Sequence, residues 1–322
     1  MRKIRWGVLG TADIARGATI PGMQQAEHCE LYAVAGRKPE KAESFRDTFG
    51  FRKAYGSYDE LLADPEVEAV YIPLPNHLHC EWAVKAMQAK KHVLCEKPLG
   101  LSEEQAAAMF RAAEENGVLL MEAFAYLHSP FIQAVKAELD AGTIGEIRYL
   151  ESAFVTGGRP DTDIRMNRET GGGAMYDLGC YTVSMAMRML EKEPETVQAY
   201  ACFSGKRIDL LTSALLLYGN GAAVRLDCSM LLPGGRHDRL LISGTRGEIV
   251  SPVRFNQSGE LTYTVVRGGV KDTKTVIAPN NYALEVENLS RCILTGEKPR
   301  ISKDFSLLVA RVTDRVLSAA GY

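Results

Sequence analysis

The sequence lacks any close grouping of cysteine and histidine. Its seven cysteines are an odd number, widely scattered and without a C-x-x-C pair. Most of them fall in apolar segments, where a free thiol behaves as a small hydrophobe. His77 and His79 form the only close histidine pair, with no ligating residues near them in the sequence. Because zinc needs such residues at close spacing, we expect no metal site, and the scattered thiols suit the cytoplasm.

Long apolar runs and an excess of positive charge are also absent. No apolar run approaches the roughly 20 residues that a membrane span needs, and the formal net charge of -2 comes without a basic tract. These absences argue against a membrane protein and against a nucleic-acid groove. The first residues, MRKIRWGVLG, lead into a strand so early that they leave no room for a cleavable signal.

What the chain does contain is an alternation of apolar strands and amphipathic helices over residues 1–124. The expected strands are IRWGVLG, CELYAVAG, VEAVYIPLP, HVLCE and VLLMEAF, with helical segments between them. Such alternation predicts a doubly wound parallel sheet, with the carboxyl ends of the strands along one edge where ligands bind. We therefore expect residues 1–124 to form a first, α/β domain.

The pattern changes after about residue 125. Helices are expected near 129–141 and 174–190, and several strand-like runs follow, separated by the turn signals YGNGA, LPGG and GTRG. Turns of this kind suggest antiparallel connections. Two helices, near 282–295 and 303–319, close the chain. We expect residues 125–322 to form an α+β domain with one mixed or largely antiparallel sheet.

The loop after the first strand is a degenerate G-x-G-x-x-G, with alanine at its second and third glycine positions. In such a turn the backbone N–H groups and a helix N-terminus approach a pyrophosphate. The expected cofactor-binding residues here are Gly10, Thr11, Ala12, Asp13 and Ile14. Alone the match is weak, and an ordinary strand–turn–helix connection is the alternative. Its place at the first strand of a βαβ series favours the dinucleotide site.

The end of the second strand selects the nucleotide. An NAD site usually has Asp or Glu there to hold the ribose 2′-hydroxyl, whereas this chain has Arg37 and Lys38 and no acid before Glu40. Because a guanidinium suits a 2′-phosphate, NADP(H) is favoured over NAD(H). The alternative is that both cations are solvated residues at the start of a helix.

The ends of the third and fourth strands supply further candidates. The prolines of IPLP hold the backbone extended, as a wall against a flat ring requires, and Pro98 restrains the chain after HVLCEK. The residues expected to border the cofactor here are Pro73, Leu74, Asn76, His79, Glu96 and Lys97. Asn76 as a helix N-cap and His79 as a core residue are the structural alternatives.

The segment ETGGGAMYDLGCYTV carries the candidate proton donor. Its three glycines let the backbone approach another surface closely. Asp177 and Tyr181 are four residues apart and are expected on one face of an α-helix, where an apolar setting demands polar company or a cleft. A capping aspartate and an ordinary core tyrosine are the alternative. Arg165 is a candidate contact for a cofactor phosphate or for substrate.

KHVLCEKPLG resembles the glucose–fructose oxidoreductase, inositol dehydrogenase and MocA family of nicotinamide-dependent oxidoreductases. Other motifs of that family occur in the same order, as GVLGTADIA, PNHLHCEWAVKAM, MEAFAY, GGGAMYDLGCY and NNYALEVENLSRCI. The resemblance implies a Rossmann domain and an α/β domain whose open sheet commonly supports homodimers or homotetramers. It also implies that Lys97 is the catalytic lysine and Tyr181 the acid that follows the family's aspartate, here Asp177.

Two departures refine the resemblance. Many sugar and inositol dehydrogenases of the family have histidine where this chain has Tyr181. In having a tyrosine at this position, the chain resembles glucose–fructose oxidoreductase, dimeric dihydrodiol dehydrogenase and NADP-dependent xylose dehydrogenases. Leu127 follows Tyr126 where close relatives often have arginine, so no sugar contact is assigned at that position.

We expect reversible hydride transfer between NADP(H) and a secondary alcohol or carbonyl carbon of a sugar, polyol or related cyclic substrate. Lys97 would bring the pKa of Tyr181 down and stabilise developing oxyanion charge, and Asp177 would orient Lys97 or a substrate hydroxyl. The alternatives are a glycoside 3-oxidoreductase with tightly held cofactor and a nicotinamide-nucleotide-binding regulatory protein. Retention of both Lys97 and Tyr181 argues against the regulatory protein, because a sensor has no use for a proton relay.

Overall fold

The computed structural model describes residues 2–252 and 255–322. The chain divides into two compact units, each assembled from segments that are distant in the sequence. The first unit comprises residues up to 100 together with 104–128 and 280–306, and the second comprises 101–103, 129–279 and 307–322. The expected domains, 1–124 and 125–322, were continuous in sequence, whereas these units are not, because a late segment returns to the first.

The first unit is built on a six-stranded sheet in the order β3-β2-β1-β4-β5-β6, in which every pairing is parallel. Its strands are β1 Ile4–Leu9, β2 Cys29–Ala35, β3 Lys53–Tyr55, β4 Ala69–Ile72, β5 His92–Glu96 and β6 Leu120–Ala123. This is the strand order of dinucleotide-binding folds, in which the order reverses between β1 and β4 and ligands bind at the carboxyl ends. The predicted doubly wound parallel sheet is confirmed.

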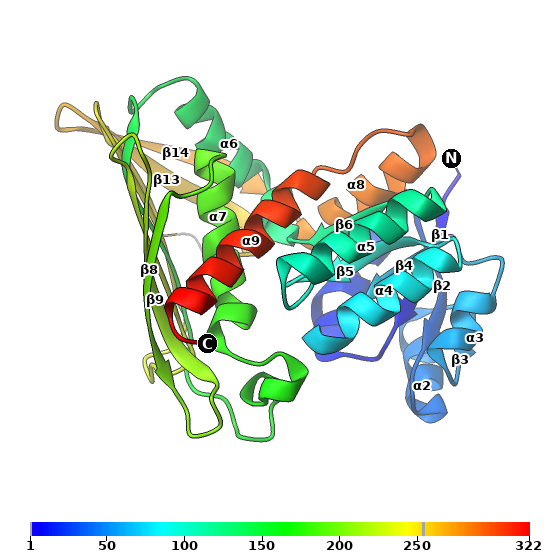
Figure 1. The fold of residues 1–322 in the computed structure, drawn as a ribbon. Helices are drawn as coiled ribbons and strands as arrows, with labels where there is room; N and C mark the ends of the chain where they lie inside the picture. The colour runs from blue at the N-terminus through cyan, green and yellow to red at the C-terminus, as the bar shows by residue number, and fades with distance from the viewer. Residues whose placement is uncertain (1, 253–254) are drawn as a thin grey trace. The chain divides into compact units, whose positions relative to one another are not determined.

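The helices of the first unit include those of the predicted alternation (Figure 1). They are α1 Ile20–Gln25, α2 Pro39–Phe49, α3 Tyr58–Ala63, α4 His79–Gln88, α5 Glu103–Asn116 and α8 Asn281–Thr295. The bounds of α2 show why the local signals were informative: Pro39 lies in its first turn, and Gly50 ends it in the left-handed region at φ 81°. The strand β3 and helix α3 were not predicted, because elements of 3 and 6 residues show too little periodicity.

Helix α8 belongs to the first unit because it packs against that unit's first strand and first helix. Trp6 of β1 is fully buried, and its indole N–H donates to Ser290 Oγ at 3.0 Å. Gly22 of α1 lies so close to the backbone of Tyr282 that a Cβ would collide with it. The pattern of the sequence predicted this helix but could not predict its partners.

The second unit contains an eight-stranded sheet in the order β14-β13-β12-β11-β7-β10-β9-β8. Its strands are β7 Ile147–Val155, β8 Thr196–Phe203, β9 Asp209–Leu217, β10 Ala223–Ser229, β11 His237–Gly244, β12 Glu248–Ser251, β13 Gly259–Arg267 and β14 Val270–Ala278. The pairing of β10 with β7 is parallel, and the others are antiparallel. The predicted α+β domain with a largely antiparallel sheet is confirmed.

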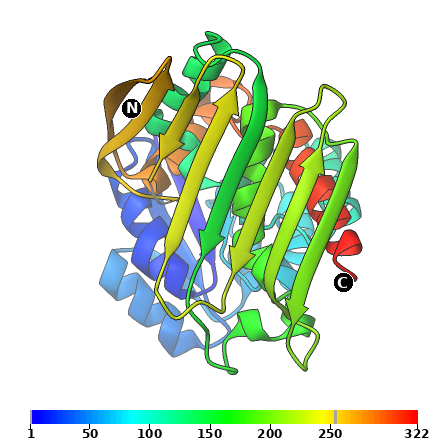
Figure 2. The same cartoon turned by 90° about the vertical axis from the view of Figure 1, so that its left-hand side faces the viewer.

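Helices cover one face of this sheet. The α-helices described in the second unit are α6 Pro130–Asp140, α7 Cys180–Leu190 and most of α9 Lys303–Ala319, the last helix of the chain. Helix α7 contacts β7 and β10, while α6 contacts β14. Figure 2 shows the opposite face towards the viewer, with no helix in front of it. None of the helices described is long and apolar enough to cross a membrane.

Candidate active site

The carboxyl ends of β1 and β4 meet at the loop that the sequence assigned to a pyrophosphate. Gly10 has a φ of 120°, and a Cβ there would lie 3.1 Å from Leu74 Cδ2. The Gly10 N–H donates to Ala35 O at 2.9 Å, which ties the loop to β2. Thr11 and Ala12 are half-buried, and Asp13 and Ile14, which follow them, are exposed. A tight turn at this point, where the strand order of the sheet reverses, fits the binding of a dinucleotide's phosphates by backbone N–H groups.

Arg37 and Lys38 follow β2 at the same edge, and both side chains are exposed. Burial raises the pKa of Tyr58, while the nearby Arg37 guanidinium acts in the opposite direction. The first residues after the strand are Gly36, Arg37 and Lys38, with no carboxylate among them. Two accessible cations beside the phosphate loop fit a nucleotide that carries a 2′-phosphate.

The segment after β4 turns towards the interior of the first unit. Pro73 and Leu74 are buried, and Asn76 is the first residue of a short 3₁₀ turn, Asn76–Leu78, rather than its N-cap. His79 is fully buried, and its Nδ1 and Nε2 each lie 2.8 Å from a backbone carbonyl oxygen, that of Pro98 and that of Leu74 respectively. The imidazole therefore links two strand-end loops, and burial lowers its pKa to about 4.

The backbone from Lys97 to Leu99 is anchored at every residue by a buried side chain. The contacts are Lys97 N–H to Glu96 Oε2 at 3.3 Å, Pro98 C=O to His79 Nδ1 at 2.8 Å, and Leu99 N–H to Glu122 Oε1 at 2.9 Å. The Lys97–Pro98 peptide bond is cis. The lysine at the end of β5 therefore stands on a segment fixed from β5, α4 and β6, which suits a side chain that must hold a defined position.

Buried carboxyl groups surround this segment. Glu96 is 9% exposed, and its Oε1 accepts a hydrogen bond from Tyr71 Oη at 2.5 Å. Tyr71 Oη in turn accepts from Thr19 Oγ1 at 2.9 Å. Burial raises the pKa of Glu122 to about 7, with Lys97 acting to lower it and Glu96 to raise it. The ammonium of Lys97 therefore lies within electrostatic reach of buried carboxyl groups.

In the second unit the glycine run packs against backbone and a buried aspartate. A Cβ on Gly172 would collide with the carbonyl oxygens of Arg165 and Asn167, and one on Gly173 would collide with Asp209 Oδ1. Asp209 is fully buried, and its Oδ2 accepts from the backbone N–H of Met175 at 2.8 Å. Burial raises its pKa to about 6. The close approach predicted from the three glycines is therefore present.

Tyr181 lies near the start of α7 in an aromatic cluster. Its ring centroid is 5.3 Å from that of Phe154 and 5.3 Å from that of Phe255. The Asn256 side-chain amide approaches the Tyr181 hydroxyl, with Nδ2 and Oη 3.5 Å apart. The ring is thus held by apolar packing on two sides, while the residue as a whole is only half-buried. A phenol held in this way keeps its hydroxyl at a defined place.

Asp177 pairs with cations of its own unit. Its Oδ2 lies 3.0 Å from Arg165 Nε and 3.5 Å from Arg159 Nη2, and the Asp177 residue is 8% exposed. Asp177 lies in a π-helical turn, Met175–Gly179, so the four-residue spacing to Tyr181 does not carry the α-helical geometry assumed from the sequence. Arg165 also pairs with Asp163, so a large part of its charge is balanced within this unit.

The structure groups the predicted site residues within each unit. Gly10 to Ile14, Arg37, Lys38 and the strand-end residues from Pro73 to Lys97 belong to the first unit, and Arg165, Asp177 and Tyr181 belong to the second. Sequence reasoning missed the side chains that support them. These are Thr19, Tyr71, Glu122 and Glu285 in the first unit and Phe154, Arg159, Asp209, Phe255 and Asn256 in the second. Polar residues inside apolar runs, such as the tyrosine of VEAVYIPLP, were the available signal.

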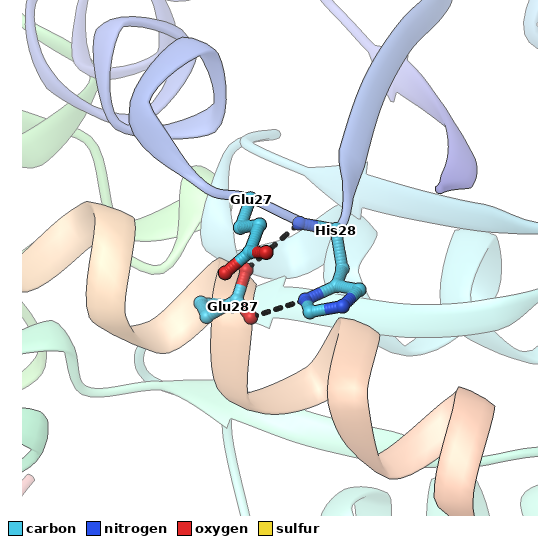
Figure 3. A group of neighbouring side chains, drawn as sticks. All are labelled: Glu27, His28 and Glu287. Carbon is cyan, nitrogen blue, oxygen red and sulfur yellow. Dashed lines mark hydrogen bonds and ion pairs between the residues drawn. The ribbon is translucent and has the colours of Figure 1, made fainter. Parts of the chain in front are cut away.

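One group among the described residues could offer several metal ligands: Glu27, His28 and Glu287 (Figure 3). Glu287 Oε1 lies 2.6 Å from His28 Nδ1, and Glu287 Oε2 accepts from the His28 backbone N–H at 3.0 Å. These contacts join α8 to the start of β2. The arrangement is explained by a histidine–carboxylate pair between two elements of the first unit.

Two family models match this chain. One, described as an oxidoreductase family with an NAD-binding Rossmann fold, matches residues 4–124, and the GFO/IDH/MocA C-terminal domain matches residues 132–250. The chain belongs to the GFO/IDH/MocA oxidoreductase family. The resemblance drawn from KHVLCEKPLG and the motifs around it is therefore confirmed.

Relatives within the GFO/IDH/MocA family match over nearly the whole chain. D-xylose 1-dehydrogenase (NADP(+)) 2 of Haloferax volcanii is 38% identical, over 98% of this chain and 97% of the relative. Trans-1,2-dihydrobenzene-1,2-diol dehydrogenase of Xenopus laevis is 30% identical, over 98% of each chain. A 3-ketoreductase from Actinomadura kijaniata, solved with NADP and TDP-benzene, aligns with a TM-score of 0.93 and 32% identity, over 99% of this chain and 98% of that one. These relatives agree with the branch indicated by Tyr181.

Proposed function

We propose that this oxidoreductase transfers a hydride between NADP(H) and a secondary alcohol or carbonyl carbon of a sugar, polyol or related cyclic substrate. The observation that carries the proposal is Lys97, which stands at the carboxyl edge of a dinucleotide-binding sheet on a backbone anchored from three sides. Relatives named as a xylose dehydrogenase, a dihydrodiol dehydrogenase and a sugar ketoreductase support the reaction class.

The residues that would hold the nucleotide lie at that edge. Gly10 to Ile14 would bind the pyrophosphate through backbone N–H groups, and Arg37 with Lys38 would bind the 2′-phosphate. Pro73, Leu74 and Asn76 would border the nicotinamide and its ribose, together with Glu96. A relative with NADP(+) in its name and another solved with NADP support this choice of cofactor. His79 would act through the loops that it joins, because both of its ring nitrogens face backbone carbonyls.

NADP(H), when bound, supplies or accepts the hydride. In reduction the Tyr181 hydroxyl donates the proton to the carbonyl oxygen, and in oxidation its phenolate accepts the proton of the alcohol. A free phenol has a pKa near 10, so a neighbouring cation is needed to bring the phenolate into the neutral range. Lys97 has that role in the proposal and donates a hydrogen bond to the developing oxyanion.

Asp177 and Arg165 complete the proposed substrate side. Asp177 is paired with Arg165 and Arg159, whose charges favour its ionised form, and this carboxylate would accept a hydrogen bond from a substrate hydroxyl. Arg165, whose contacts to Asp177 and Asp163 balance its charge, would orient that carboxylate and contact a cofactor phosphate or the substrate. The family relatives include a ketoreductase solved as variants of one lysine and of one tyrosine, which supports the choice of Lys97 and Tyr181.

Two finer expectations belong to the same proposal. The open face of the second unit's sheet would form a homodimer or homotetramer, since Tyr200 on β8 is 70% exposed there. The seven cysteines are all free thiols, which supports a cytoplasmic location.

Turnover of a substrate panel with NADPH and with NADH tests the proposal. Lys97→Met and Tyr181→Phe should each lower kcat by about 10²- to 10³-fold, because each removes a group used in the transition state. The Kd of NADPH should stay within about threefold, because neither group serves mainly in nucleotide binding. Lys85→Met and Tyr200→Phe are matched controls on exposed side chains of the same units. Unchanged kcat in both site variants would overturn the roles assigned to Lys97 and Tyr181.

A further inference from the structure

A chain of hydrogen bonds runs from Thr19, in the helical turn just before α1, to the backbone N–H of Lys97. Thr19 Oγ1 donates to Tyr71 Oη at 2.9 Å, and Tyr71 Oη donates to Glu96 Oε1 at 2.5 Å. Glu96 Oε2 accepts the backbone N–H of Lys97 at 3.3 Å. Thr19 and Tyr71 are fully buried, and Glu96 is 9% exposed. These hydroxyls are therefore out of reach of substrate, and their contacts end on the residue beside the lysine.

The direction of the chain determines what it does to Glu96. Glu96 is an acceptor from Tyr71, and a hydrogen bond donated to a carboxylate favours its ionised form. Thr19 polarises the Tyr71 hydroxyl further, because successive hydrogen bonds in a low-dielectric interior strengthen one another. Loss of the Tyr71 hydroxyl would remove this donor from the buried Glu96 carboxylate, which favours the protonated acid.

Glu285 shows what happens to a carboxyl group in this interior without donors. It lies in α8 and is fully buried, and among the residues that the structure describes neither of its carboxyl oxygens has a hydrogen-bond partner. Burial raises its pKa well above the ordinary value, and the charge of Glu96 acts in the same direction. Burial without donors therefore disfavours a charge on Glu285, whereas Glu96 has a hydrogen-bond donor on each oxygen, which favours the ionised carboxylate.

We propose that Tyr71, supported by Thr19, is a positioning residue for Lys97: its hydroxyl keeps Glu96 ionised and in place beneath the Lys97 backbone. An ionised Glu96 favours the ammonium form of Lys97, because an opposite charge nearby stabilises it. The importance of this charge for turnover rests on the proposed function, whereas the effect on Lys97 does not. The titratable groups that act on Glu96 or lie beside it are Tyr71 of β4, Cys95 of β5, Lys97, Glu122 of β6 and Glu285 of α8.

The test compares Tyr71→Phe with Tyr55→Phe in the full-length protein. Both substitutions remove a hydroxyl that donates to a carboxylate of the first unit, since Tyr55 Oη donates to Asp64 Oδ2 at 2.6 Å. The readout is the titration of the Lys97 ε-carbon signal by NMR in lysine-labelled protein, with the signal assigned by Lys97→Met. Thr19→Val, which keeps the shape of the side chain and removes its hydroxyl, is the second variant and carries the test if Tyr71→Phe does not fold.

We expect the titration midpoint of Lys97 to fall by about one pH unit or more in Tyr71→Phe, because a protonated Glu96 no longer stabilises the ammonium. Thr19→Val should shift it less in the same direction, and Tyr55→Phe should leave it unchanged. With a substrate found, kcat of Tyr71→Phe should fall at least about tenfold with KM little changed, and the pH above which reduction slows should move down. A Lys97 midpoint that is unchanged in Tyr71→Phe, or that shifts equally in Tyr55→Phe, overturns the inference. A shift of Lys97 in a protein that turns over no sugar or polyol would support it while refuting the proposed function.

Discussion

In the proposed function, the choice of nucleotide depends on the two cations after β2. Arg37 and Lys38 are both exposed at the carboxyl edge of the first unit's sheet, beside the loop that begins with Gly10. A 2′-phosphate offers charge and several acceptor oxygens to a guanidinium, whereas a ribose hydroxyl offers neither. NADP(H) and NAD(H) differ only at the ribose 2′ position, so a substitution of a residue that contacts it should change the affinity for one nucleotide and not for the other.

Arg37→Ala should weaken NADPH binding far more than NADH binding. Loss of a hydrogen-bonded contact with a charged group costs about 1.5–3 kcal/mol, or roughly tenfold to a hundredfold in Kd. Fluorescence titration of both nucleotides measures the difference. Arg46→Ala is the matched control, because Arg46 is a surface arginine of α2, the helix that follows Arg37, and is paired with Asp47. Equal weakening of NADPH and NADH in Arg37→Ala would contradict the assignment of the 2′-phosphate to this residue.

His79 illustrates how burial changes the meaning of a residue. From the sequence it was assigned to the cofactor, with a core role as the alternative. In the structure it is fully buried, and its ring nitrogens face the carbonyls of Leu74 and Pro98. Its partners are backbone atoms of two loops, which no spacing along the chain reveals. Any effect of His79 on the cofactor therefore passes through Leu74 and Pro98.

At the scale of elements, the turn before α7 shows a limit of periodicity. A spacing of four residues places two side chains on one face of an α-helix, and Asp177 and Tyr181 have that spacing. The structure instead has a π-helical turn at Met175–Gly179, with α7 beginning at Cys180. Such turns insert an extra residue into the helical ladder and often occur at functional sites. The sequence indicated a helix here but not this irregularity.

Gly173→Ala should destabilise the second unit. The Gly173 φ of 125° is a conformation that alanine rarely adopts, and the added Cβ would collide with Asp209, the residue that accepts from Met175 at the start of the helical turn. We expect the free energy of unfolding to fall by about 2 kcal/mol or more, as measured by urea denaturation. Gly205→Ala is the control, because nothing lies within 4 Å of its Cβ position. Equal stability of the two variants would contradict the packing role of this glycine.

At the scale of the whole molecule, the sheet of the second unit carries two different faces. Along β9, Thr212, Ala214 and Leu216 are buried, while Leu215 between them is only half-buried. On the neighbouring β8, Tyr200 is 70% exposed. Alternation of this kind puts one face on the core and leaves the other open. Apolar side chains on an open face favour association with a second copy.

The double substitution Tyr200→Lys with Leu215→Lys should convert an oligomer into a monomer. Placing like charges on a self-associating face opposes the contact, because each ammonium would have to lose water without a partner. Light scattering after size-exclusion chromatography measures the mass. Val270→Lys is the control, since Val270 is also 70% exposed but lies at the start of β14, beside the tight turn from β13. A monomeric parent protein would refute the proposed oligomer directly.

Much of the architecture follows from local patterns in the sequence. The continuous apolar runs of β4 and β5 indicated buried parallel strands, and the Pro39 and Gly50 signals placed α2. Glycine-rich turns indicated antiparallel connections in the second unit. The motif around Lys97 identified the family. These features depend on residues that are close in the chain, so the sequence can show them.

Other features depend on which distant residues come together in three dimensions. The return of α8 to the first unit rests on Trp6 with Ser290, and the support of Glu96 rests on Thr19 and Tyr71. Asp209, at the start of β9, accepts a hydrogen bond from Met175 in the turn before α7. Side-chain partners of this kind are selected by packing and by the need to satisfy buried polar groups. Local periodicity does not show which distant side chains meet these two requirements, so only the tertiary structure shows these partners.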